Sequence, residues 1–575
     1  MGVRLAGSFL AFFLTSFSLQ AAPMLRLASS TVGPVQLASA GATNTQTLEA
    51  YNAGDGTLSL TSASFASSAS WVTVSVGAPR NCVTVSPSNT NRCIPLTFTI
   101  NSAGLSQGLS SATVTVSGDS STVDSPQTVV VLVRIGTVET YSAPGGTRDV
   151  GFATSSYVNA SAKTTDGAKW LAVVNDGGGS FRFNYSYSIH FQPPAGMAAG
   201  DYAGSFSLTG SSNPTDNQTI PVTMHVTTQP IAVASASTAT FAPQPTTDAL
   251  NIRLAAGAPM LTYPFSAIVT VGNVGQGTLT TQAPTITGAW LKPDSVPGYG
   301  VVPGYYSVDP TGLAVGSYPG SLAFASNAAN GTVTVPINLQ IVAKGNPLIY
   351  YQGVLDNATF TPGDTVAQGD ILVVKGEQLS FSALTSAAPP LPTAAGGASV
   401  LVNQNAVPLF YTSYGQIAFQ LPYDVPTGTA MVQVKRDDGS VSNLASITIA
   451  PRAPRLLVMV NPDYSINSAA HPAHAGDVLT VYAIGLGATS PSVAAGAAAP
   501  SAEPLARASE TPNVGFGFGF FATEVTPLYA GLTPTAAGLY QINVAVPSGL
   551  QPGAVNMTVN FSGGVVSNVL PVYVQ

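Results

Sequence analysis

Internal repetition is the feature that most limits how this chain can fold. Trp71, Trp170 and Trp290 follow one another at intervals of 99 and 120 residues, and each begins an extended run. Between 22 and 33 residues after each tryptophan comes a turn in which two glycines are separated by three residues, and then an alternating strand. These turns are Gly104–Gly108, Gly196–Gly200 and Gly312–Gly316. One structural unit therefore occurs three times, with a core tryptophan in each copy.

The strands of these repeats have a period of two residues. From Phe181 to Phe191 the odd positions are aromatic or Ile and the even positions are polar, so one face meets a core and the other meets solvent. The turn at Asn52–Leu58 recurs as Asn273–Leu279. Units of about 100 residues built from such strands have the size of an immunoglobulin-like β-sandwich.

The C-terminal part carries a second duplication. Gly369-Asp370 and the strand after it recur at Gly476-Asp477, and Val441-Ser-Asn443 recurs at Val566-Ser-Asn568. The offset grows from 107 to 125 residues between these motifs, which indicates an insertion, and we expect it to be a loop at 493–512. The predicted division is a signal peptide at 1–22, sandwich repeats at 23–136, 137–228 and 229–344, and a C-terminal module with halves at 345–452 and 453–575. The predicted fold class is all-β, with about five tandem immunoglobulin-like sandwiches.

Composition excludes several other classes. Only 7% of residues are charged, with 18 Lys and Arg against 25 Asp and Glu, and the net charge is −7. A helix bundle or coiled coil needs more charge on its outer face, and a nucleic-acid-binding protein needs a basic surface. A hydrophobic content of 45% argues against a disordered chain. The 57 glycines and 44 prolines fit a protein rich in strands and turns.

The N-terminal residues predict export. Arg4 precedes an apolar run from Leu5 to Leu19, and Ala21-Ala22 offers a small-residue cleavage site, which is typical of a bacterial-type signal peptide. No later stretch of 18 or more apolar residues occurs, so we expect a secreted or cell-surface protein whose mature chain has no integral membrane segment. In an oxidising compartment Cys82 and Cys93 are expected to form a disulfide between two strands. No histidine lies near them to support a metal site.

Residues 350–575 resemble the uncharacterised C-terminal domain of secreted proteins from Solibacter-type acidobacteria. The matching residues include Pro389-Pro-Leu-Pro392, Gly396-Gly397, Pro408-Leu-Phe-Tyr411, Gly485-Leu-Gly487 and Gly538-Leu-Tyr-Gln-Ile542. This resemblance implies a secreted β-rich module without an established activity. The N-terminal repeats resemble BACON-type sandwiches through the tryptophan, the two-glycine turn and the closing strand, and that resemblance implies carbohydrate binding or a spacer.

Several motifs resemble parts of catalytic or metal sites, but the residues around each motif do not support that function. Gly104-Leu-Ser106-Gln-Gly108 matches a nucleophile elbow, but its sister turns contain no serine. His190 and His225 fall on polar strand faces. His471 and His474 have only Asp463 and Asp477 nearby as further metal ligands. Asp370 and Asp477 are interpreted as turn caps rather than a catalytic carboxylate pair. We therefore predict no catalytic residues, no metal and no cofactor.

Tyrosine supplies the remaining candidate site. Tyr299, Tyr305 and Tyr306 lie in a turn-rich segment after Trp290, and flat aromatic faces can stack on sugar rings; packing over their own core is the alternative. The sequence thus predicts an exported, non-enzymatic protein for adhesion or carbohydrate binding, with a polysaccharide or a cell-surface or matrix polymer as partner and no nucleic acid. A spacer or envelope component without a ligand is the alternative, and an accessory protein of an extracellular hydrolase is a third.

Overall fold

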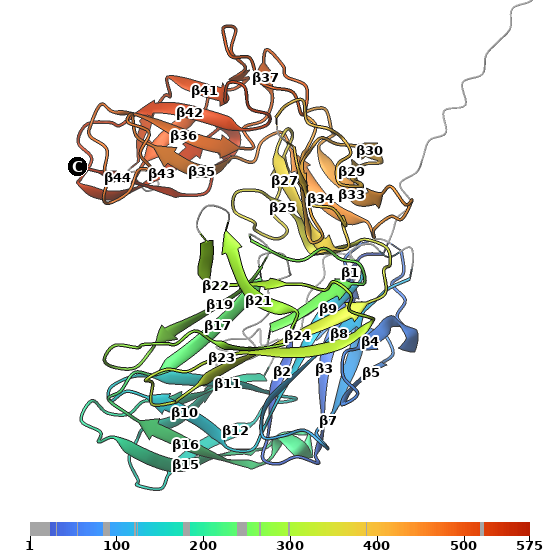
Figure 1. Cartoon of the computed structure of the whole chain (residues 1–575), viewed down its shortest axis with the longest axis vertical. Helices are drawn as coiled ribbons and strands as arrows, with labels where there is room; N and C mark the ends of the chain where they lie inside the picture. Colours follow the sequence, from blue (N-terminus) through green and yellow to red (C-terminus); the bar gives the residue numbers. More distant parts are fainter. Residues whose placement is uncertain are drawn as a thin grey trace, which may run out of the picture.

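The computed structural model describes residues 23–575 except 30, 55, 84–91, 120–121, 123–124, 176–184, 239–249, 264–265, 297–299, 387 and 518–521. Within these residues the secondary structure consists of β-strands and short 3-10 helices, and none is α-helical. No helix in this part of the chain is long and apolar enough to span a membrane. The predicted signal peptide lies outside the described residues. The predicted all-β class is confirmed, and Figure 1 shows three sandwiches below and two above.

The first sandwich encloses a core that includes Leu48, Phe98 and Val131. One sheet has the order β1-β3-β7-β5, with β6 paired to β7; its strands are β1 (Leu25–Leu27), β3 (Thr43–Asn52), β5 (Val72–Val76), β6 (Arg80–Asn81) and β7 (Arg92–Asn101). The facing strands are β2 (Thr31–Leu37), β9 (Gln127–Ile135), β8 (Gly108–Val116) and β4 (Phe65–Ser67), with the 3-10 helix η1 (Ser62–Ser64) before β4. Cys82 and Cys93 are joined with 2.08 Å between their sulfur atoms, so the predicted disulfide is present beside the β6–β7 pair.

The second sandwich shares a sheet with the first, which the sequence did not predict. Strand β11 (Arg148–Thr154) lies parallel to β2, with Ala153 opposite Val35, and the resulting sheet has the order β13-β14-β11-β2-β9-β8-β4. β13 (Leu171–Asn175) and β14 (Tyr185–Phe191) complete it. The facing sheet, β10-β16-β15-β12, consists of β10 (Val138–Ser142), β16 (Thr219–Val226), β15 (Gly200–Thr209) and β12 (Asn159–Thr164), and η2 (Pro214–Asp216) precedes β16. The two sandwiches are thus joined by strand pairing between β2 and β11 as well as by the covalent link between them.

A buried carboxylate completes this joint. Asp216 is 2% exposed and accepts hydrogen bonds from the Asn44 side chain at 3.1 Å, from the Ser155 backbone N–H at 2.9 Å and from the Ser211 hydroxyl at 2.8 Å. Asn44 belongs to the first sandwich and the others to the second. A buried carboxylate requires such partners, so Asp216 fixes the angle between the two units.

The third sandwich has two four-stranded sheets around a core that includes Trp290, Tyr306 and Leu322. The sheet β17-β19-β22-β21 consists of β17 (Ala232–Thr238), β19 (Ala267–Asn273), β22 (Gly300–Val308) and β21 (Leu291–Val296). The sheet β18-β24-β23-β20 consists of β18 (Leu250–Ala255), β24 (Val333–Val342), β23 (Gly316–Phe324) and β20 (Thr285–Thr287). Trp170 and Trp290 are buried at 0% and 6% exposure, as predicted, whereas Trp71 is only partly buried against its core.

The fourth and fifth sandwiches have matching strand orders. The fourth combines β25 (Leu348–Asp356), β27 (Ile371–Glu377), β32 (Gln416–Gln420), β31 (Leu409–Thr412) and β28 (Leu384–Thr385) with β26 (Val366–Ala367), β34 (Ala445–Ala450), β33 (Gly428–Arg436), β29 (Ala398–Val402) and β30 (Asn405–Ala406). The fifth combines β35 (Arg455–Val460), β36 (Val478–Ile484), β42 (Tyr540–Ala545), β41 (Tyr529–Leu532), β38 (Arg507–Ala508) and β37 (Thr489–Ser490) with β40 (Thr523–Val525), β39 (Asn513–Phe516), β43 (Gly553–Asn560) and β44 (Leu570–Val574). The 3-10 helix η4 (Ser562–Gly564) follows β43.

The repeated motifs make the same hydrogen bonds in each copy. The Asn52 and Asn273 side chains each accept the N–H two residues ahead at 2.9 Å, and donate to the carbonyl four residues ahead at 3.0 and 2.8 Å. Asn443 bonds both the N–H and the carbonyl of Ile349, and Asn568 does the same with Leu456. The sequence repeats are therefore repeats of local structure, as predicted.

A tyrosine of the fourth sandwich enters the core of the third. Tyr414 is 1% exposed, packs in the third core, and its hydroxyl accepts the Ala255 N–H at 2.7 Å. Beside it the Arg253 guanidinium lies 2.7 Å from the Glu377 carboxylate. Because both contacts cross from β18 to the fourth unit, they fix these two sandwiches against each other.

The predicted loop at 493–512 forms the joint between the fourth and fifth sandwiches. Apart from Arg507-Ala508 in β38, it contains no strand. Gly496 donates its N–H to the Gln420 side chain at 2.6 Å, and its carbonyl accepts the Leu391 N–H at 2.8 Å. The insertion is therefore packed, because its backbone groups find partners on the neighbouring unit.

Candidate functional site

An exposed pair of tyrosine rings lies on the third sandwich. Tyr305 stands on β22, opposite Ile268 of β19, and its ring meets the ring of Tyr263 edge to face, with 5.5 Å between centroids and an interplanar angle of 63°. Tyr263 is 45% exposed and Tyr305 is partly exposed. The two rings form an apolar surface with hydroxyl groups, which suits a sugar ring that presents both C–H and O–H groups.

A buried aspartate holds the loop that carries Tyr263. Asp294 lies at the irregularity where β21 pairs with β22, and it is 4% exposed. Its carboxylate accepts the Tyr263 N–H at 2.6 Å and the Ser295 N–H at 2.9 Å. Leu261, two residues before the tyrosine, exchanges backbone hydrogen bonds with Val308 at 2.8 and 3.0 Å. The backbone is thus fixed at Leu261 and at Tyr263, which helps to position the Tyr263 ring before any ligand arrives.

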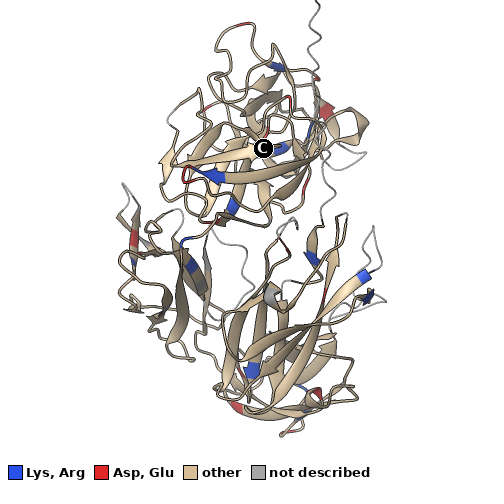
Figure 2. Cartoon of the chain, turned by 90° about the vertical axis from the view of Figure 1, so that its right-hand side faces the viewer, with Lys and Arg blue, Asp and Glu red and all other residues tan. Residues whose placement is uncertain are grey.

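The sheet face around Tyr305 carries one ion pair, between Lys292 of β21 and Asp309, with 3.7 Å between nitrogen and oxygen. Its other outward residues include Val233 and Ser235 of β17 and Ile268 and Thr270 of β19, and the Ser235 and Thr270 hydroxyl groups lie 2.8 Å apart. Figure 2 shows that charged residues are few among the uncharged ones of the described chain, although Lys435-Arg436-Asp437-Asp438 form one run of four. A surface of small hydroxyl and apolar side chains favours a neutral ligand over a charged polymer.

The structure separates the three predicted tyrosines. Tyr306 is 5% exposed and belongs to the third core, so its ring has no free face for a sugar, and burial raises the pKa of its hydroxyl. Its neighbour Tyr305 points to the other face because side chains alternate along a strand. Tyr299 lies outside the described residues. Of the predicted set, only Tyr305 is placed at a described surface.

Tyr263 was missed by sequence reasoning. It lies 42 residues before Tyr305, with three segments of the fold between them, and it belongs to no repeated motif. Position within an alternating strand identifies an outward tyrosine, but loop positions carry no such signal. Only pairing of the Leu261–Tyr263 segment with β22 brings the second ring into place.

The motifs that suggested chemistry are structural. Ser106 lies in a turn between β7 and β8 with no helix after it, so it is not a nucleophile elbow. Asp370 accepts the Ala367 N–H at 3.1 Å and Asp477 accepts the His474 N–H at 2.8 Å, each three residues back. Both aspartates are turn caps, as predicted.

Two of the four histidines pair with aspartates on neighbouring strands. The Nδ1 atoms of His190 and His225 lie 2.5 and 2.7 Å from the carboxylates of Asp149 and Asp201 across neighbouring strands. His471, His474, Asp463 and Asp477 border one shallow hollow. In the described part of the chain no group of three His, Cys, Asp or Glu residues has a geometry that holds a metal ion.

Comparisons with known proteins give likeness of fold only. No protein-family model matches the chain, and no curated protein matches it. It is similar to the SGBP-B protein of the Bacteroides ovatus mixed-linkage glucan utilization locus, solved with a mixed-linkage heptasaccharide, at 14% identity and a TM-score of 0.22, over 59% of this chain and 70% of that one.

Two further solved structures show the same limited likeness. The tandem Ig repeats of Dlar are 11% identical with a TM-score of 0.13, over 36% of this chain and 96% of that one. The γ-CGTase of an alkalophilic Bacillus clarkii is 12% identical with a TM-score of 0.15, over 54% of this chain and 36% of that one. The fold defines the class of this protein: a tandem array of β-sandwiches.

Proposed function

We propose that this protein is an exported, non-enzymatic, carbohydrate-binding protein of the cell surface or extracellular space. Its sandwiches would present the Tyr263–Tyr305 pair to a polysaccharide or to another neutral polymer, which would support adhesion. We also propose the domain limits set out above, and the relationship of residues 350–575 to the Solibacter-type domain and of the N-terminal repeats to BACON-type sandwiches. The repeated contacts of Asn443 and Asn568 and the repeated turns at Asn52 and Asn273 support these limits.

The exposed and fixed aromatic pair is the observation that supports this function. A large aromatic side chain that stays at the surface does not gain the free energy of burial. Here the buried Asp294 carboxylate holds the backbone of Tyr263 in place. Such pre-organisation lowers the cost of ordering a binding surface. A spacer without a ligand requires no exposed pair of this kind.

Polysaccharide retention tests the proposal. The full-length secreted protein is run in native gels containing soluble glucans, xylan or galactomannan, and is sedimented with cellulose or chitin. We expect Tyr305→Ala and Tyr263→Ala each to weaken binding about tenfold, because each removes a ring contact worth about 1 kcal/mol or more. Asp294→Ala should also weaken binding although it leaves both rings in the chain.

Tyr157→Ala is the matched control. Tyr157 is 53% exposed and lies on the second sandwich, so its loss should leave retention unchanged. Failure of the wild-type chain to bind any polymer would favour the spacer. Binding that survives both Tyr263→Ala and Tyr305→Ala would show that the site lies elsewhere. Hydrolysis of a glycan by the pure protein would overturn the non-enzymatic part of the proposal.

A further inference from the structure

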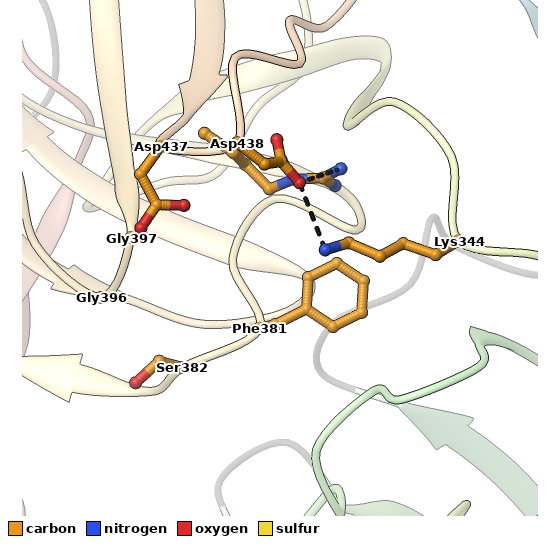
Figure 3. A pocket seen from close by; sticks show the side chains of 8 residues that line it. Lys344, Phe381, Ser382, Gly396, Gly397, Asp437 and Asp438 are labelled. Atoms are coloured by element: carbon orange, nitrogen blue, oxygen red, sulfur yellow. Dashed lines mark hydrogen bonds and ion pairs between the residues drawn. The ribbon is translucent and has the colours of Figure 1, made fainter.

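An open cavity lies on the fourth sandwich where the chain enters it from the third. Its volume of about 330 Å³ is close to that of the shallow hollow beside His471 and His474, about 380 Å³. Figure 3 shows the lining side chains around an open centre, with Asp437 on one side and Lys344 on the other. The lining residues are Lys344, Phe381, Ser382, Gly396, Gly397, Arg436, Asp437 and Asp438.

One wall of the cavity is a rigid cationic corner. The Lys344 ammonium lies 4.9 Å from the centre of the Phe381 ring and 3.2 Å from the Asp438 carboxylate. The Arg436 guanidinium lies 5.2 Å from the same ring centre and 3.3 Å from the same carboxylate. Arg436 also donates to the carbonyl groups of Gln378 at 2.8 Å and Gly345 at 2.7 Å. The charged groups of this wall pair with one another or with backbone carbonyl groups, so their positions are fixed. The wall also carries the Phe381 ring.

The opposite wall carries the polar side chains of Asp437 and Ser382, which are exposed to solvent. Asp437 donates its backbone N–H to Gly397 at 3.0 Å, but among the described residues its carboxylate has no hydrogen-bond or ion-pair partner. The Ser382 hydroxyl is likewise unpartnered within the described chain. Ala395 and Ala398 exchange backbone hydrogen bonds around Gly396 and Gly397, which both have positive φ. A Cβ on Gly397 would lie 3.1 Å from the Asp437 carboxylate, so glycine keeps this side open.

The duplicated fifth sandwich has a different arrangement at the corresponding place. There the Arg452 guanidinium lies 5.2 Å from the centre of the Phe561 ring, which stands at the position equivalent to Arg436, and 2.7 Å from Glu510. The turn equivalent to Asp437-Asp438-Gly439 is Ser562-Gly-Gly564, at the 125-residue offset. Ser562 donates its N–H and hydroxyl to Glu510 at 3.0 and 2.7 Å. The Glu510 carboxylate is therefore paired, whereas the exposed Asp437 carboxylate has no partner among the described residues.

We propose that this cavity binds one pyranose residue of a neutral saccharide, at a site separate from the tyrosine pair. Asp437 accepts hydrogen bonds from two ring hydroxyl groups, Ser382 adds a third polar contact, and the C–H face of the sugar meets the part of Phe381 that its contacts with Lys344, Arg436 and Tyr414 leave exposed. The two cations and two carboxylates of the lining balance, which favours a neutral ligand over an anion. The inference extends the proposed carbohydrate function but needs no contact from Tyr263 or Tyr305.

Titration of the full chain with single sugars tests this site. Glucose, galactose, mannose, xylose and N-acetylglucosamine are added, and saturation-transfer NMR and calorimetry record binding. At least one sugar should bind with millimolar affinity, and Asp437→Ala should weaken it about tenfold or more, because hydrogen bonds to a charged acceptor are the strong ones. Ser382→Ala should weaken it less. Asp424→Ala, which removes an exposed carboxylate of the same sandwich outside the lining, should change nothing.

The outcomes separate this site from the tyrosine pair. The double variant Tyr263→Ala with Tyr305→Ala should keep full single-sugar binding, and Asp437→Ala should keep polysaccharide retention by the tyrosines. The inference is overturned if no sugar binds, if binding is unchanged in Asp437→Ala, or if only cationic probes such as glucosamine bind. Circular dichroism of Asp437→Ala must match the wild type, because a folded variant is needed for the comparison.

Discussion

The buried Asp370 predicts a pH dependence that belongs to the fourth sandwich. Its side chain is 0% exposed at the start of β27, and it accepts the N–H groups of Ala367 at 3.1 Å and Ile371 at 2.9 Å. Loss of hydration raises its pKa to about 7 from an ordinary value of 3.8, although the two backbone hydrogen bonds act in the opposite direction. The folded state therefore holds a proton that the unfolded chain has already released at pH 5 or 6.

The sign and size of the effect follow from that difference. Because the folded pKa is raised, the stabilisation is fully present below the unfolded value of 3.8 and is lost as the pH rises through about 7. Each unit of pKa corresponds to about 1.4 kcal/mol, so the free energy of unfolding should fall by about 4 kcal/mol between pH 4 and pH 8. In Asp370→Asn this fall should disappear, while one unpaired buried N–H lowers stability by about 1–3 kcal/mol at every pH.

Hydrogen exchange localises the change in a chain of several sandwiches. Amide protection in β27 and β32, corrected for the intrinsic pH dependence of exchange, should fall by up to about three orders of magnitude between pH 4 and pH 8 in the wild type. The Asp370→Asn protein should show no such fall.

Asp477→Asn provides the matched control for this measurement. Asp477 occupies the equivalent place at the start of β36, but its side chain is 33% exposed. Its substitution should leave the pH profile of β27 as it is in the wild type. Constant protection in wild-type β27 from pH 4 to pH 8 would refute the reasoning, as would an unchanged slope in Asp370→Asn.

Two further predictions concern the joints and the disulfide. Tyr414→Phe removes the acceptor of the buried Ala255 N–H, which should lower the free energy of unfolding by about 1–3 kcal/mol; urea titration of this variant measures the loss, and an unchanged midpoint would contradict the hydrogen bond. Replacement of Cys82 and Cys93 by serine opens a loop with a sequence separation of 11, and the first sandwich should lose about 3 kcal/mol. Calorimetry should then show a lower melting temperature for one transition, and reduction of the wild type should reproduce it.

Local sequence patterns were sufficient to predict the sandwich units. The period of two from Phe181 to Phe191 and the repeated Asn52 and Asn273 turns reflect interactions within a few residues, and such interactions are the same wherever the motif stands. The Cys82–Cys93 disulfide and the capping by Asp370 and Asp477 were predictable for the same reason. Each depends on neighbours that are close along the chain.

The relations between units were not predictable in this way. Nothing in β2 or β11 indicates that Val35 will lie opposite Ala153 and join two sandwiches in one sheet. Tyr414 appears in the sequence as a residue of the fourth unit, yet it is buried in the core of the third. These contacts depend on the angle between units, which is decided by packing at the joints rather than by any local pattern.

The same distinction between local and long-range interactions applies to the candidate sites. The sequence by itself determined that the chain is all-β, repeated and poor in charge, because these properties follow from composition and from periods of two and of about 100 residues. It also placed Tyr305 and Tyr306 next to each other without deciding between them. The tertiary structure made that choice, because alternation on β22 buries Tyr306 while Tyr263 arrives from a distant loop, and only the fold brings Asp437, Phe381 and Lys344 around one cavity.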